Sequence, residues 1–139
     1  MFIRGLNKFM KKVLVIDDEP AIAQLIKLEL ESCGYSVDVA LSGTKGIEKI
    51  IQSQPDILCL DIMMPNMNGF QVLEVLNADN ELRKIPVIMV SVAAGDVEKE
   101  RAKKFGVDDF ILKPIDFEKL LKTVEKNERR LYTLEIQTK

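Results

Sequence analysis

The segment DILCLDIMMPNMNGF, residues 56–70, joins a short apolar run to an aspartate and then to a loop rich in Pro, Asn and Gly. Short apolar runs bounded by turn residues are typical of strands buried on both faces of a parallel sheet. Similar runs occur elsewhere, as VLVI before Asp17 and Asp18, VIMV before Ser91, and FIL before Lys113. The sequence therefore predicts buried parallel strands that each end at a polar side chain.

Helical patterns separate these strands. Apolar residues at three- and four-residue spacing predict helices between Pro20 and Gly34, from about Thr44 to Pro55, over 70–76, over roughly 97–105, and after Pro114. Residues 36–40 alternate apolar and polar side chains, which predicts a half-buried strand at or near a sheet edge. Five βα units result. They predict an α/β fold, with a five-stranded parallel sheet in the order 2-1-3-4-5 between two layers of helices, as in flavodoxin-like sandwiches.

The polar side chains at the strand ends are expected to meet. Carboxyl ends of parallel strands lie along one sheet edge, and open α/β sheets bind ligands there. Three close carboxylates, those of Asp17, Asp18 and Asp61, repel one another unless a cation is present or a pKa is raised. Mg²⁺ suits such a site because it takes few carboxylates and keeps waters and phosphate oxygens as its other ligands. The crevice is thus predicted to hold a hard cation and an anion.

Each of these residues also has an ordinary structural explanation. Asp17 or Asp18 can cap the helix that begins at Pro20, and Asp61 can start a turn. Ser91 can simply end its strand, and a lone Lys such as Lys113 is usually a solvated surface residue. The combination of compatible groups at four strand ends is what favours a functional site.

Composition narrows the functional classes. The chain has 139 residues, 22 acidic and 20 basic, and its net charge of −2 argues against nucleic-acid binding as the main task. The absence of His leaves carboxylates or a bound metal to carry any catalysis. Cys33 and Cys59 lack metal-site spacing and are expected to be reduced, buried thiols. With no apolar stretch long enough to cross a bilayer, a cytoplasmic location without membrane insertion is expected.

Four blocks of the chain resemble the signature blocks of the receiver domain of two-component response regulators: VLVIDDEP, DILCLDIMMPNMNGF, PVIMVSV and GVDDFILKP. The resemblance covers roughly residues 11–126. It implies that Asp61 is the phosphoacceptor, and that Mg²⁺ is bound by Asp17, Asp18, Asp61 and the backbone carbonyl of Met63. It also implies roles for Lys113 at the phosphoryl group, for Ser91 as switch hydroxyl and for Phe110 as switch aromatic, although Phe110 can equally be plain core. By the same resemblance a cis peptide bond precedes Pro114.

The resemblance also implies a function. Such a domain takes a phosphoryl group from a histidine kinase or a phosphotransfer protein and catalyses only its own phosphorylation and dephosphorylation, so it is no enzyme in the ordinary sense. Phosphorylation is expected to change the surface of the fourth helix, fifth strand and fifth helix, which would bind a downstream target, an output domain or a second copy. Met63 and Ala93 occupy positions that tune phosphoryl lifetime in the family. Neither side chain orients water by hydrogen bonding, which predicts slow self-dephosphorylation.

The domain limits are expected at residues 1–9 for an N-terminal extension, 10–126 for the receiver domain and 127–139 for a helical extension or tail. Apolar residues continue at three- and four-residue spacing from Phe117 to Leu134, with Asn127 as the polar exception. Two interpretations stay open for this end. It is either an amphipathic helix packed on its own domain and followed by a frayed tail, or a signalling helix that leads to a dimer partner or an output domain.

Rival classes fit less well. A haloacid-dehalogenase-like phosphatase needs a second Asp two residues after its nucleophile, where this chain has Met63. A flavodoxin-like carrier of FMN needs a phosphate loop rich in hydroxyls and amides, whereas the acidic DDEP segment would repel the phosphate. A phosphate-independent protein-interaction module on the same fold is the remaining alternative.

Overall fold

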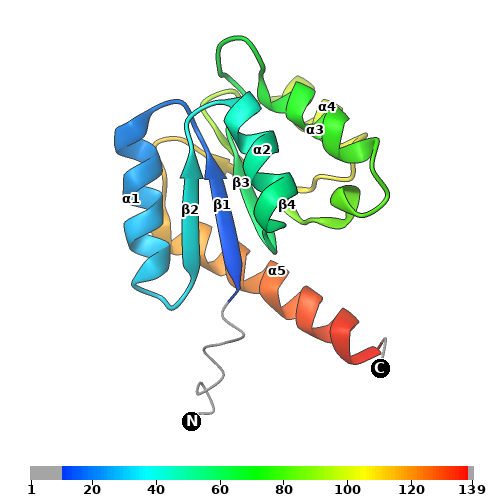
Figure 1. Cartoon of the computed structure of the whole chain (residues 1–139). Helices are drawn as coiled ribbons and strands as arrows, with labels where there is room; N and C mark the ends of the chain where they lie inside the picture. Colours follow the sequence, from blue (N-terminus) through cyan, green and yellow to red (C-terminus); the bar gives the residue numbers. More distant parts are fainter. Residues whose placement is uncertain (1–10, 138–139) are drawn as a thin grey trace.

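A computed structural model describes residues 11–137 as a parallel sheet with helices on both faces (Figure 1). The strands are β1 (Lys12–Ile16), β2 (Ser36–Ala40), β3 (Ile57–Leu60), β4 (Val87–Ser91) and β5 (Asp109–Leu112). The helices are α1 (Pro20–Glu31), α2 (Gly43–Ser53), α3 (Gly69–Asn77), the short 3₁₀ helix η2 (Leu82–Lys84), α4 (Asp96–Lys103) and α5 (Phe117–Gln137). The order β2-β1-β3-β4-β5 confirms the predicted topology and places β2 at an edge.

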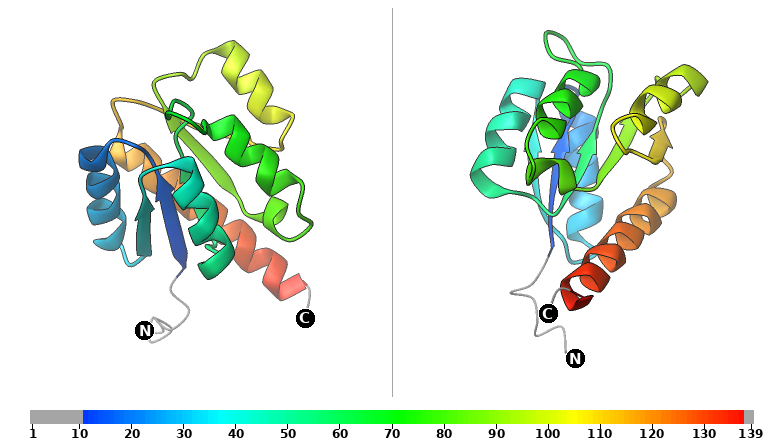
Figure 2. Two further views of the ribbon diagram at one scale, coloured as in Figure 1. Left: turned by 45° about the horizontal axis from the view of Figure 1, so that its top comes forward. Right: turned by 90° about the vertical axis from the view of Figure 1, so that its right-hand side faces the viewer.

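Two apolar layers enclose the sheet because successive side chains of a strand point to opposite faces. Leu14 and Ile16 of β1 pack with the helices α2, α3 and α4 on one face. Val13 and Val15 of the same strand pack with α1 and α5 on the other face. Figure 2 shows these layers from two further directions. The strands β1, β3 and β4 are buried on both faces, as their continuous apolar runs predict. The same prediction is wrong for β5, where Leu112 is exposed, because β5 is an edge strand of the sheet.

Local sequence explains most helix ends. Pro20 occupies the first turn of α1, and Gly34 adopts a positive φ of 96° in the turn beyond it. Ser42 caps α2 by accepting a hydrogen bond from Lys45 N, at 3.1 Å. Asn68 and Gln71 form a reciprocal capping box at the start of α3. Short polar residues and Gly therefore set these boundaries, while α4 begins and ends slightly earlier than its apolar spacing predicts.

Two expectations need correction. The helix-cap alternative for Asp17 and Asp18 is wrong, because Glu19 occupies the cap position of α1, and its own side chain makes no capping hydrogen bond. The Cys33 thiol is exposed rather than buried, because it lies in the turn after α1 and not on the inner face of the helix. Cys59, inside β3, is buried as expected, and neither cysteine forms a disulfide.

Helix α5 extends beyond the sheet against which its first turns pack. Leu120 and Val124 are fully buried against the sheet, and the helix continues without interruption past Asn127 to Gln137. Leu134 and Ile136, by contrast, are 56% and 55% exposed. In Figure 1 the last turns of α5 extend past the lower edge of the sheet.

The expected N-terminal extension, residues 1–9, lies outside the described residues. Within 11–137, no helix combines the length and the apolar character that crossing a bilayer requires.

Candidate functional site

Strand pairing brings Asp17 and Asp61 side by side. β1 lies between β2 and β3, with Ile16 opposite both Ala40 and Leu60. The next residue of each strand continues this alignment, since Asp61 N donates to Ile16 O at 3.0 Å. Both aspartates are almost fully buried, at 1% and 4% exposure. The predicted convergence of these two acids at the carboxyl edge of the sheet is therefore observed.

Lys113 reaches into this group of acids from the end of β5. Its Nζ lies 2.8 Å from Asp17 Oδ2, 3.0 Å from Glu19 Oε1 and 3.2 Å from Asp61 Oδ2. The backbone fixes the lysine as well, because Lys113 N donates to Ser91 O at 3.1 Å. The Lys113 side chain is only 9% exposed. It is thus a buried counter-ion of the carboxylates and not the solvated lysine of the alternative interpretation.

Two pKa values in the site are raised, for different reasons. Burial raises the pKa of Asp17 above its ordinary value, and this effect exceeds the opposing influence of Lys113 and of the Glu19 amide. Burial alone would lower the pKa of Lys113, but its contacts with Asp17 and Glu19 outweigh burial and raise it. The lysine therefore stays charged and holds the acidic group together.

The acids fit a hard cation. Oxygen atoms of Asp17, Glu19 and Asp61 all lie within 4.8 Å of one another. Asp17 Oδ2 is buried and, despite its ion pair with Lys113, makes no hydrogen bond within the described part of the chain. An oxygen with free lone pairs beside two further carboxylates matches the ligand preference of Mg²⁺. Asp18, predicted as a ligand, is half-buried and is not part of this group of three.

Glu19 is the residue of the site that the sequence reasoning missed. The sequence feature that could have indicated Glu19 is its position as the third acid of the DDE run, two residues after Asp17. The start of α1 turns the chain there, so that Glu19 N donates to Asp17 Oδ1 at 2.9 Å and its carboxylate contacts Lys113. At 60% side-chain exposure Glu19 lies at the mouth of the site.

The remaining predicted residues lie in the loop after β3 and on β4 and β5. Met63 N donates to Asp61 Oδ1 at 3.2 Å, while the Met63 side chain is exposed. Ser91 is buried at the end of β4, and its Oγ accepts a hydrogen bond from Ala93 N at 3.2 Å. Phe110, on β5, is half-buried and packs against the core on the side of α3 and α4. The peptide bond between Lys113 and Pro114 is cis, as expected.

A tight backbone contact shapes the loop after Asp61. Gly69 N donates to Ile62 O at 2.8 Å, and a Cβ on Gly69 would lie 2.4 Å from Asp61 O. The obstacle is backbone, which cannot rotate away as a side chain can. Only glycine therefore lets the start of α3 approach Asp61 so closely.

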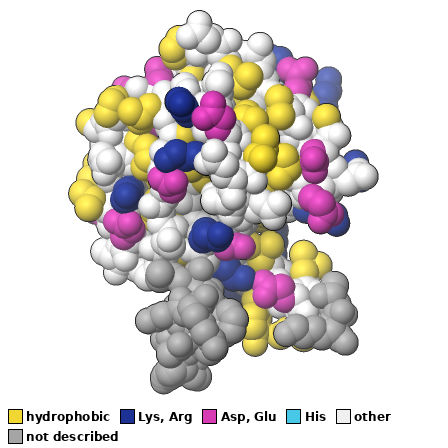
Figure 3. Space-filling model, viewed as in Figure 1, with side chains coloured by type: hydrophobic (Ala, Val, Ile, Leu, Met, Phe, Trp, Pro, Cys, Tyr) yellow, Lys and Arg dark blue, Asp and Glu magenta, His cyan; other side chains and the backbone are white. Residues whose placement is uncertain are grey.

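Beside this loop lies a pocket of about 550 Å³, whose lining includes Met63, Met64 and Ala93. Phe70 and Arg101 also line this pocket, and the Arg101 guanidinium carbon lies 4.2 Å from the centroid of the Phe70 ring. On the face seen in Figure 3, positive and negative side chains are interspersed and form no basic patch.

Comparisons with known proteins agree with the geometry. Residues 13–125 match the family model described as "Response regulator receiver domain". RpaA of Synechocystis, described as a DNA-binding dual master transcriptional regulator, is 39% identical over 121 residues. That match covers 87% of this chain but only 50% of RpaA. Protein PilH of Pseudomonas aeruginosa is 37% identical over 115 residues, covering 83% of this chain and 95% of PilH.

A solved structure supports the fold assignment. The receiver domain of the Francisella response regulator 1452 superimposes with a TM-score of 0.80 at 32% identity, covering 87% of this chain and 98% of that one. This chain thus spans about half of the longer relative RpaA and nearly all of PilH and of the Francisella domain.

Proposed function

Because this chain belongs to the response regulator receiver domain family of two-component systems, we propose that Asp61 accepts a phosphoryl group from a histidine kinase or a histidine phosphotransfer protein. The observation that carries the proposal is the buried Asp61 carboxylate held 3.2 Å from Lys113 Nζ and beside Asp17. A surface aspartate that merely starts a turn needs neither contact.

The transfer is a displacement at phosphorus. A carboxylate oxygen of Asp61 forms the new P–O bond as the P–N bond to the donor's imidazole breaks, and the imidazole leaves with the bonding electron pair. Lys113 Nζ donates a hydrogen bond to Asp61 Oδ2, so it can also donate to an oxygen of the transferring group. Positioned charge, rather than a general base, supplies the rate enhancement, as is usual for phosphoryl transfer.

A magnesium ion belongs to this proposal. Asp17, Asp61 and the Met63 backbone carbonyl would hold it directly, and Asp18 and Glu19 add negative charge at the mouth of the site. Bound Mg²⁺ neutralises charge on the phosphoryl oxygens. Within the chain, burial keeps the carboxylates in a medium of low polarity, where their attraction for a cation is stronger than in water.

The phosphorylated state is expected to reorganise the surface around the β5 edge of the sheet. Ser91 and Lys113 can each make a charge-assisted hydrogen bond to the phosphoryl group, contributing roughly 1.5–3 kcal/mol apiece. Together they approach the roughly 5.5 kcal/mol that turns a 1:99 equilibrium into 99:1. Phe110 then moves inward behind Ser91. The surface of α4, β5 and α5 changes as a result and binds a downstream protein, an output domain or a second copy.

Intact-mass spectrometry tests the proposal. The chain is incubated with acetyl phosphate, with and without Mg²⁺, beside the variant Asp61→Asn. One added phosphoryl group that needs both Asp61 and Mg²⁺ is the expected result. A folded protein that gains no phosphoryl group and does not bind beryllofluoride would instead favour the phosphate-independent interaction module.

A further inference from the structure

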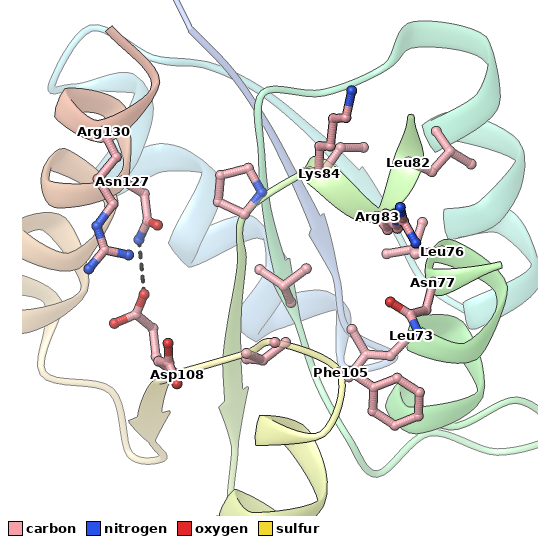
Figure 4. Close-up of a pocket in the computed structure, with 16 residues that line it drawn as sticks. Leu73, Leu76, Asn77, Leu82, Arg83, Lys84, Phe105, Asp108, Asn127 and Arg130 are labelled. Atoms are coloured by element: carbon pink, nitrogen blue, oxygen red, sulfur yellow. Dashed lines mark hydrogen bonds between the residues drawn. The ribbon is translucent and has the colours of Figure 1, made fainter. Parts of the chain in front are cut away.

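A second pocket lies far from Asp61, where β4 and β5 begin. It has a volume of about 220 Å³ and lies between the end of α3, η2, the connection from α4 to β5, and α5. Figure 4 shows Arg130 and Asn127 reaching into it from α5, with Arg83 on the opposite side and Leu73 and Phe105 along its wall. The phosphoacceptor chemistry uses none of these side chains.

Both arginines of the pocket lack a counter-ion. Neither Arg83 nor Arg130 makes an ion pair or a hydrogen bond with any side chain in the described range 11–137. Lys84 also lines the pocket, but it differs from the arginines because its Nζ pairs with Glu81 at 3.1 Å. Two free guanidinium groups that line one small pocket offer the planar donors that carboxylates and phosphates match best.

The acids of the pocket only partly oppose this charge. Asp109 is already engaged, because Lys126 donates to its Oδ1 and Asn127 Nδ2 to its Oδ2, the latter at 3.1 Å. Asn127 is held in turn by Thr123 O, at 2.9 Å. Asp108 is exposed and remains the one lining carboxylate without a partner among the described residues. The two free cations therefore exceed the one free anion.

The apolar wall decides what kind of anion fits. Leu73, Leu76 and Val87 are buried core residues whose edges line the pocket, and Phe105 packs beside them. A fully hydrated inorganic anion would gain nothing from that wall, whereas a ring or chain that covers it is removed from water. We propose that this pocket binds a small organic anion, in which an apolar body lies on the Leu73 side and a carboxylate or phosphate contacts Arg130, while Arg83 on the opposite side adds positive charge from a distance.

The location gives such a ligand access to the proposed output surface. Asp109 begins β5 and directly precedes Phe110, and the same carboxylate holds Asn127 on α5. A ligand in the pocket contacts this α5–β5 junction from the side away from Asp61. The binding itself does not depend on phosphorylation, so it can succeed or fail independently of the proposed function.

NMR titration of the unphosphorylated chain tests the inference. The probes are benzoate and phenylphosphonate, which cannot transfer a phosphoryl group, and inorganic phosphate, which lacks an apolar body. We expect saturable amide shifts at Val87, Val107 and Asn127 with one or both aromatic probes, and binding of inorganic phosphate at least about tenfold weaker. The stronger aromatic probe identifies the anionic group that the pocket prefers.

Charge variants make the test specific. Arg130→Gln should weaken binding about tenfold, Arg83→Gln should weaken it less, and Asp108→Asn should strengthen it. The control is Arg129→Gln, at an exposed arginine of α5 that does not line the pocket, which should leave binding unchanged. Thermal unfolding of each variant checks that the fold is intact. Shifts that do not saturate, shifts centred elsewhere, or an equal loss in Arg129→Gln would each overturn the proposal, because they indicate only general attraction between charges.

Discussion

Lys113 decides the charge balance of the site because it is the cation that contacts Asp17, Glu19 and Asp61 together. Replacing it in Lys113→Met leaves two buried carboxylates without their counter-ion. Removing one partner of a buried ion pair typically costs about 3–5 kcal/mol. We expect a loss of that size in the free energy of urea unfolding measured without divalent cations.

The control for Lys113→Met is Lys122→Met. Lys122 pairs with Glu118 on the exposed face of α5, and exposed pairs contribute little. If both variants unfold at the same urea concentration, the buried charge cluster does not contribute to stability as described.

Met63 lies two residues after Asp61, and its side chain is exposed at the mouth of the site. A thioether is a poor hydrogen-bonding group and does not orient water for attack on the phosphoryl group. Met63→Asn should therefore shorten the lifetime of the phosphorylated chain, by about tenfold if one oriented water accounts for the effect. Loss of the phosphoryl adduct is followed by intact mass, with Met63→Leu as the apolar control. An unchanged lifetime in Met63→Asn would contradict this role of Met63.

At the scale of elements, Tyr35 connects the start of β2 to α5. Its hydroxyl donates to Glu128 Oε1 at 2.6 Å, and burial, followed by this hydrogen bond, raises the pKa of Tyr35. Because the folded state favours the neutral phenol, this stabilisation is complete below the unfolded pKa of about 10 and is lost as the pH rises above it. Tyr35→Phe should cost about 1 kcal/mol at pH 7.

The same difference should shrink as the pH rises from 9 to 11. Urea unfolding of the native chain and of Tyr35→Phe across this range measures it, with Tyr132→Phe as the control because that ring is exposed. A difference between the native chain and Tyr35→Phe that stays constant with pH would show that the Tyr35 hydroxyl is not a buried donor.

The last turns of α5 present a different case. Tyr132, Leu134 and Ile136 are all more than half exposed, and the contact of Glu135 with Lys11 is a surface ion pair of 2.7 Å. A chain that ends at Leu131 should therefore lose only about 0.5 kcal/mol of stability or less. A chain that ends at Thr123 is the control and should unfold, because it lacks the buried Val124 and Asn127.

Sedimentation of the same truncated chain tests the open interpretations of this end. A native chain that dimerises, beside a monomeric chain ending at Leu131, would support pairing of two α5 ends. If both the native and the truncated chain sediment as monomers, the result would favour a helix that packs on its own domain or leads to an output domain.

At the scale of the whole molecule, cation binding should stabilise the entire fold, because the site joins the ends of β1, β3 and β5. A ligand that binds only the native state adds about 2.7 kcal/mol at a concentration of 100 Kd. We expect Mg²⁺ to raise the thermal midpoint and EDTA to reverse the increase. Asp17→Asn should abolish the response, while Asp79→Asn, outside the site, should retain it. A response that persists in Asp17→Asn would assign the cation to another site.

The sequence by itself determined the fold of this protein and the edge of the sheet that carries its chemistry. Runs such as ILCL before Asp61 are apolar on both faces and end at polar residues, so they predict buried parallel strands whose ends must lie in line. The positions of Asp17, Asp61, Ser91 and Lys113 follow from strand order alone.

Only the tertiary structure decided which side chains contact one another. The turn into α1 places the Glu19 carboxylate in contact with Lys113. The spacing of apolar residues could not predict this contact, because it says nothing about where a carboxylate at a helix start points. The turn after α1 exposes Cys33, and the approach of α5 to β5 forms the pocket with Arg130. Strand and helix patterns are local and survive in any context, whereas pair contacts of about 3 Å depend on how elements distant in the chain pack together.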